Sequence, residues 1–228
     1  MKALSFLSVV FFLLATCSEE DDKPPLFTPG NGVTDVDGNS YPSIVLDDQE
    51  WMASNLKTTK YSNGDPIPNV PDDSWGTITS GAWCYYNNDA AMNSAYGKLY
   101  NWYAVSNTKK ICPSGWRIPD DSDWSKLINH LGGENEAGGK MKREGTQFWN
   151  PPNEGATNTS GFNGVPGGNR RGANNSAFEV FGTLGRHWSS SQFDQDAAWG
   201  YDLVNETTSL DRHQFNKGYG FSCRCIRE

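Results

Sequence analysis

The chain contains 228 residues, enough for one large domain or two small ones, and its formal net charge is −8 at pH 7. An acidic surface repels the phosphates of nucleic acids, and no cluster of lysines and arginines offsets this charge. The densest basic run, KMKRE at 140–144, is typical of a solvated edge, so the composition excludes a role in binding DNA or RNA.

Residues 1–16 have the pattern of a signal peptide. Met1 and Lys2 form a positive end, and an apolar run follows that is too short to cross a bilayer permanently. The run ends in LLATC, which resembles a bacterial lipobox, with Thr16 where Gly, Ala or Ser is usual. The resemblance implies cleavage before Cys17 and acylation of this cysteine, so that lipid alone attaches the protein to a membrane. The alternative is plain secretion with a free cysteine near the cleavage site.

Residues 17–34 form a predicted tether, acidic at first (SEEDD) and then rich in Pro, Gly and Asn. Neighbouring carboxylates repel one another and stay solvated, which favours a flexible segment. The string CSEEDD also resembles the acidic export signal that follows the acylated cysteine in surface lipoproteins of the Bacteroidetes. That resemblance implies a protein anchored in the outer membrane and exposed on its outer face.

The first element expected after the tether is a β-hairpin over 35–56. Turn signals (DGN, then DD) flank the apolar stretch YPSIVL, and EWMASNL follows. Asp35, Asp37 and Asn39 have the spacing that opens a calcium loop. However, the glycine comes two positions early, and Leu46 stands where such a loop has glutamate. A turn therefore explains these residues better.

The middle of the chain predicts a loop, a strand and a helix in turn. Three prolines mark a long loop over 63–78, and GAWCYYNND at 81–89 indicates a short strand. The segment 96–107 is a predicted helix with Asn107 as its C-cap. Its core-facing residues recur at the helical spacing i, i+3, i+4, i+7: Leu99, Trp102, Tyr103 and Ser106.

The stretch CPSGWRIPDDSDWSKLINHLGG at 112–133 predicts a second helix. Asp120 follows a proline and is placed to accept hydrogen bonds from the first backbone N–H groups as the N-cap. Apolar residues from Trp124 to Leu131 then fall on one face, and a Gly-Gly pair ends the helix. Acid–base chemistry by the carboxylates here is the alternative, but capping explains them better because nothing basic stands beside them.

The last third of the chain predicts short β segments. They alternate with glycine-rich turns and stand at 161–168, 177–182, 186–191, 197–204 and 220–226. Two helices followed by short strands indicate an α+β fold, with short antiparallel strands, two main helices and long loops.

Four cysteines remain beyond Cys17: Cys84, Cys112, Cys223 and Cys225. An even number in an exported chain suggests two disulfides, with three connectivities open. Metal binding is the alternative, but the chain has no Cys-x-x-Cys pair. The two late cysteines alternate with one arginine, so on a strand both would face the same side.

An ordered set of strings places the chain near a known family. WMASNL, WCYYNND, YGKLYNWYAV, CPSGWRIPDDSDW, AGGKMK, GFNGVPGG, WSSS and GFSCRCI occur in the order seen in the Fibrobacter succinogenes major paralogous domain, which the chain resembles from about residue 35 onward. The resemblance implies a C-type lectin-like fold over 35–228, distantly similar to the formylglycine-generating sulfatase-modifying enzymes.

The same resemblance implies a disulfide pattern. This chain has Cys223 where the family usually has valine, and it lacks a cysteine that many members carry soon after WCY. The implied bridges therefore join Cys84 to Cys223 and Cys112 to Cys225. Each bridge would close a loop of more than a hundred residues and stabilise the fold by about 4 kcal/mol in the chain-entropy model.

The motifs that would imply catalysis or a cofactor are missing. The calcium-binding strings of C-type lectins, Walker loops, G-x-S-x-G and H-E-x-x-H do not occur, and His130, His187 and His213 share no ligand spacing. The enzymes of the related family need free thiolates to bind copper, whereas disulfides explain the cysteines of this chain better. We therefore expect no enzyme activity and no cofactor.

Aromatic residues supply the candidates for ligand binding. Trp75, Trp149 and Trp199 each fall in a predicted loop, where an exposed ring would stack on a glycan or on an extracellular protein. Asp194 and Asp196 lie beside Trp199, and a calcium or glycan contact there competes with an ordinary exposed loop. The predicted function is a non-catalytic binding or adhesion module. The alternatives are a sulfatase-modifying-factor-like oxidoreductase and a purely structural envelope component.

Overall fold

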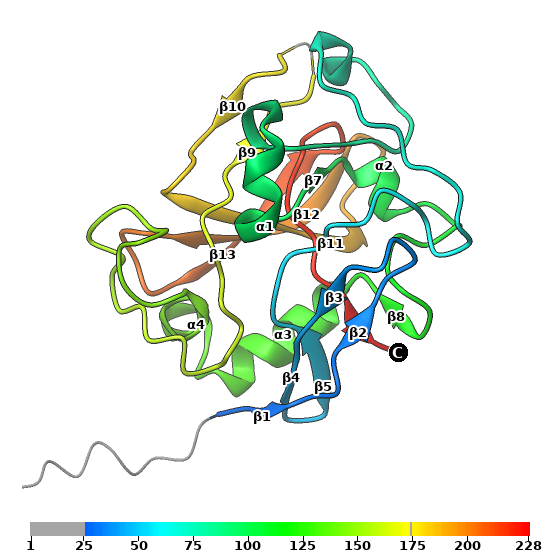
Figure 1. Cartoon of the computed structure of the whole chain (residues 1–228). Helices are drawn as coiled ribbons and strands as arrows, with labels where there is room; N and C mark the ends of the chain where they lie inside the picture. Colours follow the sequence, from blue (N-terminus) through cyan, green and yellow to red (C-terminus); the bar gives the residue numbers. More distant parts are fainter. Residues whose placement is uncertain (1–25, 174) are drawn as a thin grey trace, which may run out of the picture.

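A five-stranded sheet brings the two ends of the described chain together. The structure is a computed structural model and describes residues 26–173 and 175–228. The strand order is β1-β4-β5-β14-β8 and every pairing is antiparallel. The strands are β1 (Thr28–Pro29), β4 (Ser43–Leu46), β5 (Gln49–Met52), β14 (Ile226–Arg227) and β8 (Trp116–Arg117). Because β14 pairs with both β5 and β8, the C-terminal strand lies inside the sheet (Figure 1).

The longest strands form a separate three-stranded antiparallel sheet in the order β11-β12-β13. These strands are β11 (Leu184–Gln192), β12 (Ala197–Val204) and β13 (Leu210–Asn216). Strands near 186–191 and 197–204 were predicted, whereas β13 was not. Tyr201 and Leu203 project from one face of β12 into the cluster that contains Trp124, and the Trp124 and Tyr201 rings stack at 4.6 Å. The sheet therefore packs against the helix that carries Trp124.

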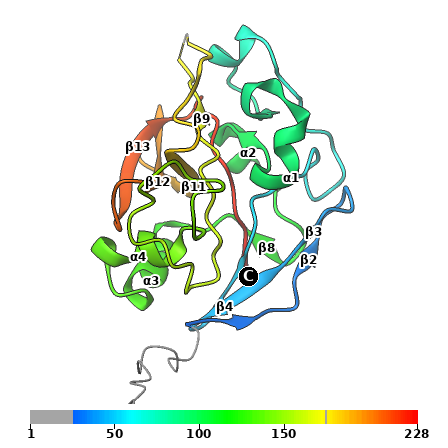
Figure 2. The same ribbon diagram turned by 60° about the vertical axis from the view of Figure 1, so that its left-hand side comes forward.

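That helix is α3 (Asp121–His130), and its predicted cap is confirmed. The Asp120 side chain accepts from the backbone N–H groups of Ser122 and Asp123, while the Asp123 carboxylate accepts from the Asp120 N–H, which completes a capping box. Gly132 and Gly133 follow with φ of 99° each. A second helix, α4 (Glu134–Met141), begins at once beside α3 and was not predicted (Figure 2).

The helix predicted over 96–107 is wrong. The structure has instead α1 (Asn93–Tyr96), β7 (Leu99–Tyr100) and α2 (Trp102–Val105), each of two to four residues. Gly97 adopts a φ of 73° and ends α1. Backbone groups of Tyr100 then bond to Phe221, far away in the sequence. Long-range strand pairing therefore outweighs the local helical spacing.

Short elements complete the fold. The remaining strands are β2 (Val33–Thr34), β3 (Ser40–Tyr41), β6 (Trp83–Cys84), β9 (Asn169–Arg170) and β10 (Phe178–Glu179), and the 3-10 turns are η2 (Asp73–Gly76), η3 (Tyr86–Asn88) and η4 (Ala90–Met92). Of the hairpin expected over 35–56, β4 and β5 pair as predicted, whereas β3 pairs with β2, which lies before this range. The architecture is thus mixed, with small antiparallel sheets and few helices, as the α+β prediction required.

The tether predicted over 17–34 overlaps the folded domain at its C-terminal end. Residues 28–29 pair with β4, and residues 33–34 pair with β3, so both belong to the folded domain. Phe27 packs against the core cluster that contains Trp51. The signal peptide, Cys17 and the acidic run lie outside the described residues. Among the residues that are described, no helix is both long enough and apolar enough to span a bilayer.

Five buried cations in the described part of the chain fix the long loops. Lys98, Lys142, Lys217, Arg170 and Arg224 are each at most 6% exposed. Their N–H groups donate to backbone carbonyls of segments far apart in the sequence, and each cation lies over an aromatic ring. A buried charge is costly unless it is hydrogen-bonded, and a buried carbonyl needs a donor. The cations and the loop carbonyls therefore satisfy each other.

Candidate functional site

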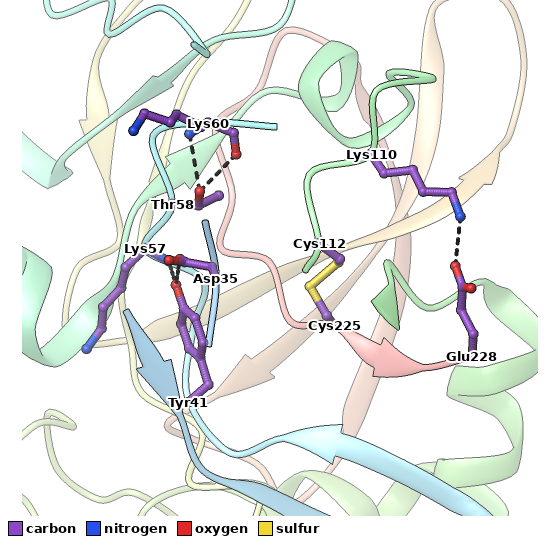
Figure 3. The surroundings of a disulfide bond; sticks show 9 residues. All are labelled: Asp35, Tyr41, Lys57, Thr58, Lys60, Lys110, Cys112, Cys225 and Glu228. Carbon is purple, nitrogen blue, oxygen red and sulfur yellow. Dashed lines mark hydrogen bonds and ion pairs between the residues drawn. A yellow bond between two sulfur atoms is a disulfide. The ribbon is translucent and has the colours of Figure 1, made fainter. Parts of the chain in front are cut away.

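The predicted bridge between Cys112 and Cys225 is confirmed. The two sulfurs are bonded across a sequence separation of 113 residues. Figure 3 shows the bridge joining the loop before β8 to the segment that leads into β14, with Lys110 and Glu228 paired nearby. Both cysteines are buried in the largest core cluster. The bridge therefore joins the middle of the chain to its C-terminal segment.

The predicted bridge between Cys84 and Cys223 is wrong, and both residues are buried free thiols. Cys84 pairs with Leu99 across β6 and β7, while the next residue of β7 pairs with Phe221 on its other side. Two strand spacings, roughly 9.5 Å, thus separate β6 from the segment around Phe221 that continues to Cys223, beyond the span of a disulfide. The side chains also face opposite sides, because Cys84 packs with Leu99 whereas Cys223 packs with Tyr100.

The free thiols are poorly suited to nucleophilic chemistry. Burial raises the pKa of the Cys84 thiol to about 12 and raises the pKa of Cys223 further above its usual value. The thiolate is the reactive form of cysteine, and both side chains are fully buried. His187 is also buried, and burial together with the charge of Arg224 lowers its pKa well below the usual value. These side chains serve packing and internal hydrogen bonds.

Two of the three tryptophans predicted to be exposed are buried. Trp75 is 0% and Trp149 is 1% exposed, and they belong to different core clusters. Their loops fold over them, because Arg170 covers the ring of Trp75 and Lys142 covers that of Trp149. The prediction of exposure for these two residues is wrong, and the three tryptophans share no common surface.

Trp199 lies at the surface, in a patch that we call the aromatic platform: Phe193, Trp199 and Arg212. Phe193 is 45% exposed and meets the Trp199 ring edge-to-face at 4.9 Å. The Arg212 guanidinium lies 3.4 Å from the centre of the Trp199 ring. Arg212 also pairs with Asp121 at the start of α3. The platform therefore offers an exposed ring, a partly buried ring and a cation in one place.

The two predicted acidic residues flank the platform, and one of them shapes its turn. Asp194 and Asp196 are exposed in the turn between β11 and β12. One oxygen of Asp194 accepts from the backbone N–H groups of Asp196 and Ala197, both at 2.8 Å, so this carboxylate caps the turn. Among the described residues, no group of three or more His, Cys, Asp or Glu side chains is arranged to hold a metal ion.

A cavity of about 260 Å³ opens beside the disulfide. Val105, Ile111, Cys112 and Ile118 form its apolar lining, while Asp120 and Ser190 contribute polar groups. The four apolar residues are at most 7% exposed, whereas Asp120 and Ser190 are partly exposed. The cavity thus combines a buried apolar floor with a polar rim that solvent reaches.

The positive charges at this cavity are already paired. Lys110 lies 2.8 Å from a carboxylate oxygen of Glu228, as Figure 3 shows. Arg117 forms a bidentate ion pair with the Asp123 carboxylate, and one of its two hydrogen bonds measures 2.9 Å. Because each cation has its own carboxylate, the cavity carries little net positive charge for an anionic ligand.

The cavity and the aromatic platform adjoin at the start of α3. Asp120 lines the cavity, and the next residue, Asp121, pairs with Arg212 of the platform. The backbone N–H of Asp121 also donates to the Ser191 hydroxyl at 3.0 Å, next to Ser190 of the cavity. The sequence pointed to the segment 192–199 but not to Phe193 or Arg212 as binding residues. The exposed phenylalanine in QFDQDAAW was the available signal, while Arg212 lies on the unpredicted β13.

Comparison with known proteins settles the family. The chain matches the Fibrobacter succinogenes major domain over residues 44–227. The protein belongs to this family. The match covers most of the chain and includes the disulfide, the cavity and the aromatic platform. No curated protein and no solved structure is similar enough to match.

Proposed function

We propose that this member of the Fibrobacter succinogenes major domain family is a non-catalytic binding module for glycans. The observation that carries the proposal is the aromatic platform beside a half-polar cavity. Protein sites for sugars combine an apolar ring face with polar side chains that satisfy hydroxyl groups, and Phe193, Arg212 and Asp120 supply these elements here. We also propose that the domain has a C-type lectin-like fold, on the strength of the motifs quoted above.

The disulfide and the burial of the free cysteines support a binding role over an oxidoreductase role. Cys112 and Cys225 are bonded to each other, and burial raises the pKa of Cys84 to about 12. A reactive cysteine pair would have to reach a substrate as thiolates, whereas Cys84 and Cys223 face different core clusters. The residues best suited to redox chemistry are thus committed to the interior.

The proposed location is the outer face of the outer membrane, with Cys17 acylated. Support comes from the sequence of residues 1–23, which lie outside the described residues. The first described strand, β1, begins at Thr28, so about ten residues would separate the lipid from the domain. Treatment of cells with an external protease and metabolic labelling with a palmitate analogue would test exposure and acylation separately.

An array of glycans and extracellular-matrix proteins tests the binding proposal. Phe193→Ala removes an exposed ring and should weaken a glycan signal about tenfold or more, because central aromatic contacts dominate such interfaces. Val36→Ala is the matched control, since Val36 is 46% exposed in the turn between β2 and β3. An array without glycan signal, or equal loss in both variants, would contradict the proposal. Binding to matrix proteins alone would replace the glycan by a protein partner, and no binding at all would favour a structural envelope role.

A further inference from the structure

We infer that the cavity beside the Cys112–Cys225 bridge is a subsite for one neutral sugar ring, held by Asp120 and Ser190. The inference rests on the proposed glycan-binding function and assigns part of the ligand to a particular place. The aromatic platform would then contact the next sugar of the same chain, because Asp120 and Asp121 are consecutive and their Cα atoms are about 3.8 Å apart.

The hydrogen-bonding state of Asp120 supports the subsite. Its Oδ1 atom accepts all the capping bonds of α3, from the Ser122 N–H, the Ser122 hydroxyl and the Asp123 N–H, at 2.7–3.0 Å. Within the described part of the chain, Oδ2 of Asp120 accepts no hydrogen bond. A carboxylate oxygen has two acceptor positions, which suits two neighbouring hydroxyl groups of a sugar. Helix capping therefore fixes this carboxylate and leaves one oxygen free.

The floor and the size of the cavity fit a single ring. The apolar floor of Val105, Ile111 and Ile118 matches the C–H face of a pyranose, which is the apolar side of a sugar. A volume of about 260 Å³ lies below the 300–1,000 Å³ that is typical of sites for drug-sized ligands. An oligosaccharide would therefore place one ring in the cavity and extend past Ser190 toward Phe193.

The charges specify a neutral sugar. Lys110 pairs with Glu228, and Arg117 pairs with Asp123, so neither cation is left for a uronate or a sulfated sugar. The free oxygen of Asp120 would repel an anionic substituent. Neutral hexosides and N-acetylhexosaminides remain as the class that satisfies both the carboxylate and the apolar floor.

NMR titration of the full protein with methyl glycosides of glucose, galactose, mannose and N-acetylglucosamine tests this subsite. At least one glycoside should shift the backbone resonances of Ile118, Asp120 and Ser190. Asp120→Asn should weaken its binding about tenfold or more, because asparagine caps a helix as well as aspartate but presents an N–H donor where the free oxygen stood. Asp89→Asn is the control, since Asp89 caps η4 through the Ala91 N–H in the same way and lies outside the cavity.

The outcomes separate the subsite from the general function. Glycan binding on the array that depends on Phe193 but leaves the resonances of Ile118 and Ser190 unshifted would overturn the subsite and keep the function. Equal binding by wild type and Asp120→Asn would also overturn it, provided that both variants melt at the same temperature. If neither the array nor the NMR titration detected sugar binding, the proposed function itself would be refuted. Ser190→Phe, which fills the cavity from its rim, should abolish the glycoside shifts.

Discussion

Lys142→Met tests the idea that buried cations hold the loops of this fold. Lys142 is 0% exposed, and its Nζ lies 2.7–2.8 Å from the carbonyl oxygens of Glu154, Val204 and Thr207. Burial lowers the pKa of Lys142 to about 8, so the ammonium group keeps its proton at pH 7. Methionine has a similar shape but no donor, so the three partly buried hydrogen bonds to these carbonyls are lost.

The expected loss of stability is large. A hydrogen bond from a charged group contributes about 1.5–3 kcal/mol, and methionine relieves the cost of burying a charge, so the net destabilisation should be about 3–5 kcal/mol. Urea denaturation at pH 7 measures it. With a slope of about 2 kcal/mol per molar urea, the midpoint should fall by roughly 2 M.

Lys126→Met provides the comparison, because the Lys126 side chain is 60% exposed and meets Asp48 only at the surface. Such pairs contribute about 0–1 kcal/mol, so this variant should unfold almost as the wild type does. If Lys142→Met cost no more than Lys126→Met, the carbonyl contacts of Lys142 would not stabilise the loops, and the reasoning would be wrong.

Three further predictions concern sulfur and histidine. In the denatured protein without reductant, two thiols, those of Cys84 and Cys223, should react with Ellman's reagent in addition to that of an unacylated Cys17. In the native protein neither of the two should react, because both are buried. Serine at both Cys112 and Cys225 should lower the free energy of unfolding by about 4–5 kcal/mol, because the bridge spans 113 residues, and a smaller loss in urea denaturation would contradict the chain-entropy account. Burial lowers the pKa of His187 well below its usual value of 6.5, so just below pH 6.5 this imidazole becomes protonated in the unfolded chain but stays neutral in the folded protein. Stability should therefore fall there by up to about 1.4 kcal/mol per pH unit, and His187→Gln should lack this slope.

Local signals predicted the elements that local contacts determine. The α3 helix begins after Asp120 and ends before Gly132 as expected, because the cap, the apolar face and the glycine stop all act within about ten residues. The helix expected over 96–107 failed for the opposite reason. Leu99 and Tyr100 form a strand that is held by Cys84, Trp83 and Phe221, and no local pattern reports those partners.

The candidate site was predicted only in part, and burial explains the difference. The loop predicted around Trp149 is present and Trp75 lies in the short 3-10 turn η2, whereas Trp199, also predicted in a loop, lies on strand β12. In a fold whose loops cross the core, a loop tryptophan is covered when a cation from another segment reaches it, as Arg170 reaches Trp75. Arg170 is 100 residues away in sequence from Val70, whose carbonyl it binds. Its contacts with Val70 and with the Trp75 ring therefore cannot be predicted from the sequence of the loop alone.

The same internal contacts make the proposed binding surface rigid before any ligand arrives. Lys217 donates to the carbonyls of Asp194 at 3.0 Å and Gln195 at 2.6 Å, which fixes the turn that carries Phe193 from beneath. Asp121 ties Ser191 and Arg212 to the start of α3. A site that is already ordered loses less conformational entropy on binding, so weak stacking and a few hydroxyl contacts suffice for useful affinity. The buried cations and the Cys112–Cys225 bridge thus hold the loops of the proposed binding surface in place, which lowers the entropic cost of binding a sugar.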